Sequence, residues 1–182
     1  KKLISNAGYF SDKKSKLNKI SKSTALHNTL TIEDYSSCTF IKSQTNLIIN
    51  KSLKVFKKNI IFENNYWKIS GGHDGYLNKF GTTHEREIEF YPEQMKFIGY
   101  DKLIRKVPNK KIKFDIRFHL DPKSKVMKTQ NNQSILIEID EEGWKFSCEN
   151  LDINIDNGLY FGNKNLYKEN QNILISGINN EK

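Results

Sequence analysis

The amino-acid sequence predicts an all-β protein, an antiparallel two-sheet β-sandwich. Three observations support this prediction. Apolar and polar residues alternate along much of the chain, helical periodicity is nearly absent, and turn-forming residues recur roughly every 8 to 12 residues. The alternation is clearest over Ile112–Phe118, where every second residue is apolar and would point to one buried face.

The predicted strands follow one another along the whole chain and are separated by turn signals such as Tyr91–Gln94, Asn131–Asn132 and Asp140–Gly143. In chain order they are Thr29–Ile32, Cys38–Ile41, Leu53–Phe62, Tyr66–Gly71, Glu85–Tyr91, Met95–Leu103, Ile112–Leu120, Lys125–Thr129, Ser134–Ile139, Trp144–Cys148, Leu151–Ile155, Leu159–Phe161 and Ile173–Ser176.

Two polar segments interrupt this pattern. Asp12–Ser23 is rich in Lys and Ser and lacks alternation, so we expect a mobile loop or a linker there. Asn163–Gln171 reads as a second polar connection. Neither segment marks a sharp change of composition, and residues 1–182 are therefore expected to form a single β-sandwich domain.

Size and composition fit a domain that folds around its own core. With 182 residues the chain can bury a core without disulfides, and its two cysteines, Cys38 and Cys148, read as small apolar residues. No apolar run has the length of a membrane span. The first residues include neither a starting Met nor an apolar signal core, so we expect the chain to be a piece of a longer protein.

The net charge of +9 favours an anionic partner such as an acidic polysaccharide, a nucleic acid or an anionic membrane surface. A surface rich in Lys, Asn and Ile is also what a low-GC genome would give any protein. Only three of the 30 basic residues are Arg, although recognition of phosphates and bases relies heavily on Arg. The charge therefore gives little support to nucleic-acid binding.

The four histidines lie in short, distinctive segments. His27 precedes a predicted strand, at a rim where a side chain would face a cleft or be held as a structural histidine. His73 lies in Gly71–Tyr76, which contains three glycines and therefore predicts an unusual turn. Tyr76 would be suited to moving a proton there. The alternative is a plain hairpin in which Asp74 caps its own turn.

His84 begins a predicted strand on which Arg86 and Ile88 share its face, while Glu85 and Glu87 point the other way. A neutral imidazole at such a rim makes a good zinc ligand when a carboxylate fixes its tautomer. His119 lies between Phe118 and Leu120 and reads as structural. It is expected to face away from the core, toward solvent or a neighbouring domain.

These segments, in this order, resemble the C-terminal β-sheet domain of the heparinase II/III-like polysaccharide lyases. The most specific pieces are Ala25–Ile32, His73–Tyr76 and His84–Arg86, followed by Ile116–Leu120, Gly143–Phe146 and Tyr160–Gly162. The resemblance runs from about Ser21 to Gly177. It implies β-elimination of a uronic-acid-containing polysaccharide, in which a base removes the proton alpha to the uronate carboxylate and an acid protonates the leaving oxygen.

The resemblance also implies roles for particular residues. His27, His73 and Tyr76 are the catalytic candidates, and Asn28 and Arg86 are candidates to bind the substrate. A zinc ion held by His27, Asp74 and His84 is a further expectation, because relatives place either a catalytic or a zinc-binding histidine at the position of His27. The aspartate that such relatives supply would fall in Ser43–Asn46, where this chain has none.

The family places its cleft between this sheet domain and an N-terminal helical toroid, which is missing from these residues. The expected partners are therefore an anionic polysaccharide and that helical domain, with no nucleic acid and no membrane, and the chain alone is expected to be inactive. The compartment is unknown, although the resemblance implies the periplasm or the extracellular space. The alternatives are a non-catalytic carbohydrate-binding or structural β-sandwich and, more weakly, a basic nucleic-acid-binding β-domain.

Overall fold

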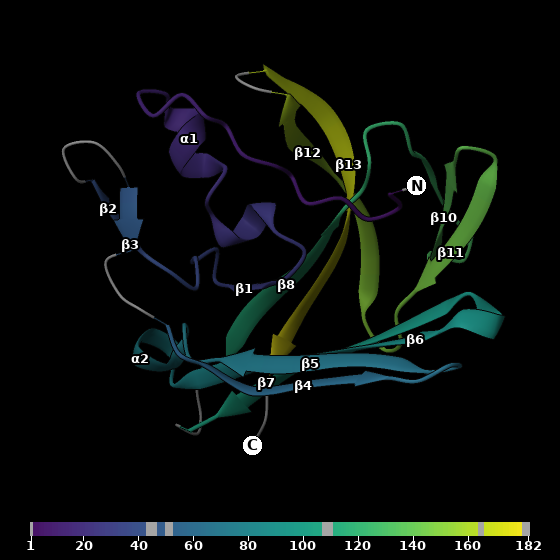
Figure 1. Ribbon diagram of the computed structural model, residues 1–182, viewed down its shortest axis with the longest axis horizontal. Coiled ribbons are helices and arrows are strands. Elements are labelled where there is room, and N and C mark those ends of the chain that lie inside the picture. The colour runs from purple at the N-terminus through teal and green to yellow at the C-terminus, as the bar shows by residue number, and fades with distance from the viewer. Residues whose placement is uncertain (1, 43–46, 50–52, 107–110, 164–165, 180–182) are drawn as a thin grey trace. The chain divides into compact units, whose positions relative to one another are not determined.

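The computed structural model describes residues 2–42, 47–49, 53–106, 111–163 and 166–179, and antiparallel strands dominate these residues (Figure 1). The predicted all-β, antiparallel fold is confirmed. The strands are β1 (Leu30–Ile32), β2 (Phe40–Lys42), β3 (Leu47–Ile49), β4 (Val55–Phe62), β5 (Trp67–His73), β6 (Thr82–Tyr91), β7 (Lys96–Arg105), β8 (Ile112–His119), β9 (Lys125–Lys128), β10 (Ser134–Ile139), β11 (Glu142–Ser147), β12 (Asp152–Asn163) and β13 (Leu166–Asn179).

The helices are short. They are α1 (Lys16–Ile20) and α2 (Leu77–Phe80), with 3-10 turns η1 (Thr24–Leu26) and η2 (Pro92–Gln94). No helix in the described part of the chain combines the length and the apolar character that crossing a membrane requires.

The contacts divide the chain into two compact units, described separately below. Unit 1 comprises Lys1–Ser36, Ile41–Ile48 and Lys113–Ile178, and unit 2 comprises Ser37–Phe40, Ile49–Ile112 and Asn179–Lys182. The expectation of one domain over residues 1–182 stays a prediction.

Unit 1 contains a sheet of order β1-β8-β13-β12 and a smaller sheet of order β11-β10-β9. Alternation on β10 buries Ile135, Ile137 and Ile139 in turn, as the period-two pattern requires. These side chains belong to a core that is completed by residues of β12, β13 and the end of β8, and its fully buried members include Leu120, Ile153 and Ile173.

Two polar segments of unit 1 are more ordered than their composition predicts. The expectation of a mobile loop or linker over Asp12–Ser23 is wrong for its central part, where the Ser15 hydroxyl caps helix α1 and Asn18 is buried, its amide donating to the Phe10 carbonyl. Most of the expected connection Asn163–Gln171 is strand instead, because β12 and β13 pair along almost their full length and satisfy each other's backbone groups.

Unit 2 is built on a four-stranded antiparallel sheet of order β4-β5-β6-β7. Its register places Trp67 opposite Phe90 and His73 opposite His84, while Arg86 faces Asp101 on the next strand. Successive residues of β6 therefore face opposite sides. His84, Arg86 and Ile88 share one side, and the glutamates between them lie on the other.

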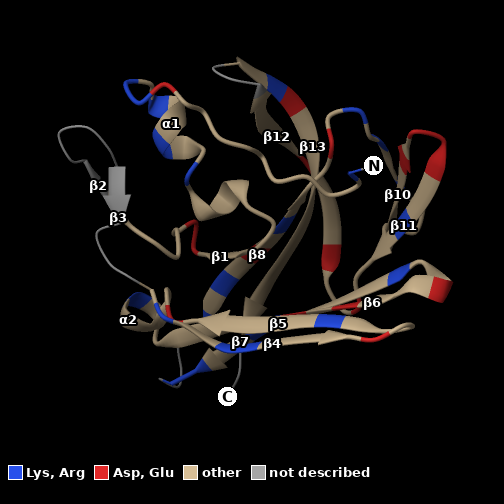
Figure 2. Ribbon diagram, in the orientation of Figure 1, with Lys and Arg blue, Asp and Glu red and all other residues tan. Residues whose placement is uncertain are grey.

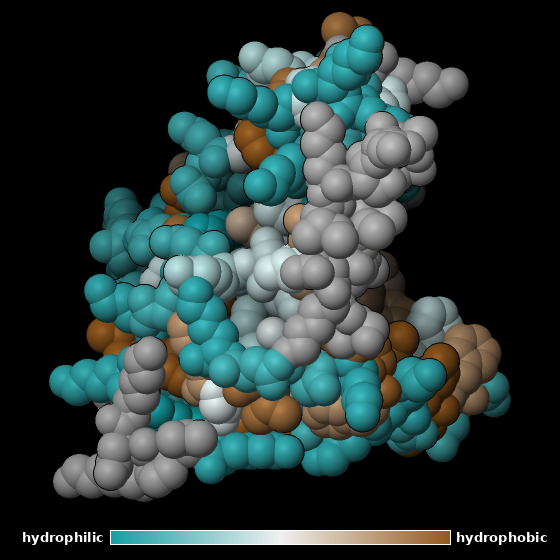
Figure 3. Space-filling model, turned by 90° about the vertical axis from the view of Figure 1, so that its left-hand side faces the viewer, coloured by the Kyte–Doolittle hydropathy of each residue, from teal (hydrophilic) through white to brown (hydrophobic). Residues whose placement is uncertain are grey.

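Charged residues of both signs are distributed over the strands, with lysines prominent around α1 (Figure 2). On the face drawn in Figure 3, hydrophilic residues cover much of the surface and hydrophobic residues form separate patches among them. The excess of positive charge is thus spread out rather than confined to one element.

Candidate functional site

The turn after β5 brings together the residues of the Gly71–Tyr76 motif. The backbone passes close to neighbouring segments here, since a Cβ atom on Gly75 would lie 2.5 Å from the Ser37 carbonyl oxygen. A side chain at this position would collide with backbone, which explains the glycine. The turn ends with Tyr76 at the N-terminal boundary of α2, only 1% exposed, and its ring lies against that of His73.

A chain of polar contacts crosses the sheet from this turn. The Gly75 N–H donates to His73 Nδ1 at 3.2 Å, and His73 Nε2 lies 3.3 Å from His84 Nδ1. His84 Nε2 lies 2.5 Å from Asp101 Oδ1. Arg86 completes the group through two hydrogen bonds of 2.8 Å to the two Asp101 oxygens. We call these four side chains, His73, His84, Asp101 and Arg86, the imidazole network.

The ring nitrogens that carry protons in the imidazole network can be assigned by starting from the Gly75 N–H. Because the Gly75 N–H donates to His73 Nδ1, the proton of a neutral His73 must be on Nε2, where it is donated to His84 Nδ1. His84 then carries its own proton on Nε2 and donates it to Asp101. Both imidazoles are therefore assigned as neutral, and each of their ring nitrogens has a partner.

The electrostatics agree with this assignment. Burial and the neighbouring His84 lower the pKa of His73 to about 4, with a smaller opposing effect from Asp74. For Asp101, burial alone would raise the pKa, but the hydrogen bonds from His84 and Arg86 and the charge of Arg86 outweigh it and lower the pKa. At neutral pH the network thus contains an ionised carboxylate paired with a guanidinium.

Asp101 is the member of the network that the sequence analysis missed. Its position opposite Arg86 follows from the hairpin register, because β6 and β7 pair outward from the turn at Tyr91–Lys96. Counting from that turn along the sequence would have placed a carboxylate opposite Arg86, on the face that Arg86 shares with His84. The predicted sharing of one face by these two residues is confirmed by their common partner.

His27 lies in unit 1, directly after the 3-10 turn η1. Its imidazole is partly buried, and burial lowers its pKa below the ordinary value. Among the described residues no hydrogen bond to this ring is found. Of the four histidines, His27 is thus the one with neither ring nitrogen hydrogen-bonded in the described part of the chain, whereas His119 is bonded through Nε2 and not through its buried Nδ1.

The segment around His27 is held by His119. The Asn28 side-chain oxygen accepts the His119 N–H at 2.7 Å, and His119 Nε2 donates to the Ala25 carbonyl oxygen at 3.0 Å. The expectation that His119 faces solvent or another domain is wrong, because the segment Ala25–Asn28 covers this side of β8 and leaves His119 only 1% exposed. Burial, the largest effect, lowers the pKa of His119.

Two of the three residues predicted to hold zinc have other hydrogen-bond partners in the structure. Both ring nitrogens of His84 are occupied, and an Asp74 side-chain oxygen accepts the Lys54 N–H at 2.7 Å. No group of three or more His, Cys, Asp or Glu side chains that could hold a metal was found among the residues that the structure describes. The stretch Ser43–Asn46, where relatives supply an aspartate, lies outside them. Zinc binding stays a prediction.

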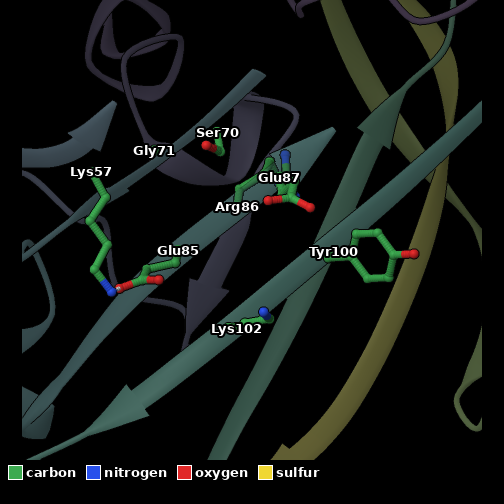
Figure 4. Close-up of a pocket in the computed structure, with 8 residues that line it drawn as sticks. All are labelled: Lys57, Ser70, Gly71, Glu85, Arg86, Glu87, Tyr100 and Lys102. Atoms are coloured by element: carbon green, nitrogen blue, oxygen red, sulfur yellow. Dashed lines mark hydrogen bonds and ion pairs between the residues drawn. The ribbon is translucent and has the colours of Figure 1, made fainter. Parts of the chain in front are cut away.

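The two predicted substrate-binding side chains already have partners. Asn28 holds the His119 backbone, and Arg86 is paired with Asp101. The glutamate side of the unit 2 sheet contains a hollow (Figure 4) in which the Lys57 ammonium and the Glu85 carboxylate point toward one another, 2.7 Å apart. The residues lining it are Lys57, Ser70, Gly71, Glu85, Arg86, Glu87, Tyr100 and Lys102. With acidic and basic groups in contact, this hollow has no strong preference for a polyanion.

Comparison with solved structures finds the same fold in a heparan sulfate lyase and in a heparinase III. The heparan sulfate lyase HepC from Pedobacter heparinus superimposes with a TM-score of 0.74 and 14% sequence identity, over 97% of this chain and 26% of that chain. The heparinase III BT4657 gene product gives a TM-score of 0.71 and 15% identity, over 97% of this chain and 25% of that one. This chain therefore spans about a quarter of the length of these enzymes.

No curated protein sequence matches the chain significantly. The family model described as heparinase II/III-like, C-terminal, however, matches residues 1–181, almost the entire chain. Together with the antiparallel fold, this match shows that the chain belongs to the heparinase II/III-like family and corresponds to its C-terminal domain.

Proposed function

We propose that this chain is the C-terminal domain of a polysaccharide lyase that cleaves a uronic-acid-containing polysaccharide by β-elimination, and that His27 is the residue through which it takes part in the chemistry. The observation that carries the proposal is the state of His27. Its ring is partly buried, its pKa is lowered by that burial, and the described residues leave its nitrogens available.

The chemistry needs a group of this kind. Removing the proton alpha to a uronate carboxylate requires a base that is unprotonated near neutral pH, and a His with a lowered pKa meets that condition. The same free nitrogens would also suit a metal ligand, the second role that the family resemblance suggested. The backbone around His27 is fixed by Asn28 and His119, so the ring is presented from a rigid segment.

His73 and Tyr76 stay predicted participants, but their surroundings favour a supporting role. Every ring nitrogen of His73 is hydrogen-bonded, and Tyr76 is 1% exposed. A polymeric substrate would reach the Tyr76 hydroxyl only if α2 and the turn before it moved. Proton transfer by His73 would require breaking one of its two hydrogen bonds.

The substrate is inferred to be anionic. The net charge of +9 would concentrate a polyanion around the protein and speed its association at low salt. The solved enzymes that share the fold are a heparan sulfate lyase and a heparinase III, both consistent with a glycosaminoglycan substrate. We further propose that these 182 residues alone do not turn over substrate, because about three quarters of each matched enzyme lies outside the matched part.

The test compares the full-length protein with a fragment of residues 1–182 on heparin, heparan sulfate and alginate. Turnover is followed by the ultraviolet absorbance of the unsaturated uronate product. In the full-length protein we expect His27→Gln to lower kcat by roughly 10²–10⁴-fold while substrate binding persists. The exposed Lys168→Gln on β13 serves as the control and should keep its activity.

Three results would contradict the proposal in distinguishable ways. Turnover by the fragment alone would remove the requirement for a second domain. Full activity of His27→Gln would remove His27 from the chemistry. Binding of the polysaccharide without any turnover in the full-length protein would identify a carbohydrate-binding module instead.

A further inference from the structure

One side of the unit 2 sheet exposes large apolar residues at the end formed by the β4–β5 and β6–β7 hairpins. Two adjacent rows cross the strands. The first contains Phe62, Trp67, Phe90 and Phe97, and the second contains Ile60, Ile69 and Ile88, with Gly99 at its end. We call these two rows the apolar face. Phe62 is 74% exposed, Ile60 73%, Phe97 57% and Ile69 54%.

Such a surface is unusual for a soluble domain. Single exposed apolar residues are common, but a contiguous set of aromatic and aliphatic side chains on one side of a sheet marks an interaction site. The apolar face is bounded by the next row on the same side, where Arg86 and Asp101 are bonded to each other. An apolar centre beside a polar border is the usual composition of a protein–protein interface.

The orientation of the rings argues against a sugar as the ligand. The Phe62 and Trp67 rings are stacked on each other at 4.8 Å with an interplanar angle of 28°. The Phe90 and Phe97 rings are stacked at 4.3 Å and 21°. One of the two faces of each ring is therefore covered by its neighbour, and Trp67 also contacts Phe90 at 5.0 Å, which leaves less open ring face on which a saccharide could stack. The adjacent isoleucine row offers a sugar no hydrogen bonds.

We propose that the apolar face is the docking surface for a polypeptide segment of the same protein that lies outside these 182 residues. The inference rests on the proposed function, in that it takes the protein to have the additional length of the enzymes with the same fold. Those enzymes align with 97% of this chain, yet about three quarters of their own length lies beyond the match. A second copy of the chain is the competing occupant, and a crosslinked dimer would identify it.

The occupant is expected to present an apolar surface without buried charge. Neither row of the apolar face contains a charged residue, and the indole N–H of Trp67 is the one polar side-chain group in the two rows. An ion placed there would lose its hydration without compensation. A helix or sheet face with its own aliphatic stripe matches this requirement.

The experiment uses the full-length protein with the photoreactive amino acid benzoylphenylalanine in place of Phe62, and in a control in place of Met127. Met127 is 63% exposed and lies on β9 in unit 1, so the two positions are matched in exposure. We expect irradiation at position 62 to give an intramolecular crosslink to residues outside the 182, identified by mass spectrometry. We expect the variant with benzoylphenylalanine at position 127 to give no such crosslink.

Three outcomes would overturn the inference. These are a crosslinked dimer, a crosslink to residues within the 182, and no crosslink above that of the control. Mixing isotopically light and heavy protein separates intramolecular from intermolecular products. Lyase turnover is measured on the same samples, so a crosslinked but inactive protein would refute the proposed function and leave the docking surface intact.

A second measurement needs no substitution and covers the case in which the photoreactive variant does not fold. Hydroxyl-radical labelling of the unmodified full-length protein compares Trp67, 39% exposed, with Trp144, which is packed against the unit 1 core. In these 182 residues alone the more exposed Trp67 should be labelled faster than Trp144. If the apolar face is covered in the full-length protein, Trp67 should instead be labelled more slowly than Trp144. Faster labelling of Trp67 would show that the apolar face is open and would overturn the proposal.

Discussion

Acidification should destabilise unit 2 through His73. Its pKa is about 4 in the folded protein, against an ordinary value of 6.5, so the unfolded chain takes up a proton first as the pH falls. The free energy of unfolding that depends on a neutral His73 is therefore fully present above pH 6.5 and is lost progressively as the pH falls toward 4. One pKa unit corresponds to about 1.36 kcal/mol, so the difference in pKa between the unfolded and the folded chain corresponds to about 3 kcal/mol. Partial exposure of the ring to solvent reduces this contribution to about 2 kcal/mol.

The assay is urea unfolding between pH 4.5 and 7.5, followed by tryptophan fluorescence in a Trp144→Phe background, so that Trp67 reports on the sheet that contains His73. His73→Asn keeps a polar side chain but cannot be protonated in this range. We expect the free energy of unfolding of the parent to fall by about 2 kcal/mol more than that of His73→Asn over this range. Equal pH dependence of the two proteins would refute the assignment of a neutral, half-buried His73.

Three further changes test the packing of the two units, each by the free energy of unfolding in urea. Asp101→Ala should cost about 3–5 kcal/mol because it leaves Arg86 uncompensated, whereas Lys57→Ala, which removes an exposed ion pair, should cost at most about 1 kcal/mol. Gly75→Ala should cost about 1–3 kcal/mol through its clash with backbone, but Gly143→Ala, with open space around it, should show no such clash. Ile153→Ala should cost about 2–5 kcal/mol, since this side chain is fully buried in the unit 1 core.

Much of the strand arrangement could be predicted because a half-buried strand leaves a period-two pattern in the sequence. The pattern located β10 at its observed bounds and placed His84 and Arg86 on one side of β6. It failed for helix α1, because five residues are too few to show helical periodicity. It also failed between Asn163 and Gln171, where polar residues form paired strands.

Buried polar residues show why the sequence misled in that region. Asn170 and Asn172 are 5% and 2% exposed, and the Asn170 amide donates to the Leu120 carbonyl oxygen. An amide that satisfies a backbone carbonyl in the core is indistinguishable, in the sequence, from one that faces water in a loop. The information that separates the two cases is the identity of the partner, 50 residues away in the chain.

The candidate site depended on the same kind of information. The sequence identified histidines with unusual neighbours but could not show which of them had free ring nitrogens. Pairing distinguishes them: His73 and His84 satisfy each other and Asp101, and His119 holds the segment of Ala25 and Asn28. The nitrogens of His73 and His84 are all bonded, so these two residues must break a bond to exchange a proton, and His119 is held in the interior through Nε2. His27 has no such bond within the described chain, and burial lowers its pKa, which is why we propose this imidazole rather than the other three for the chemistry.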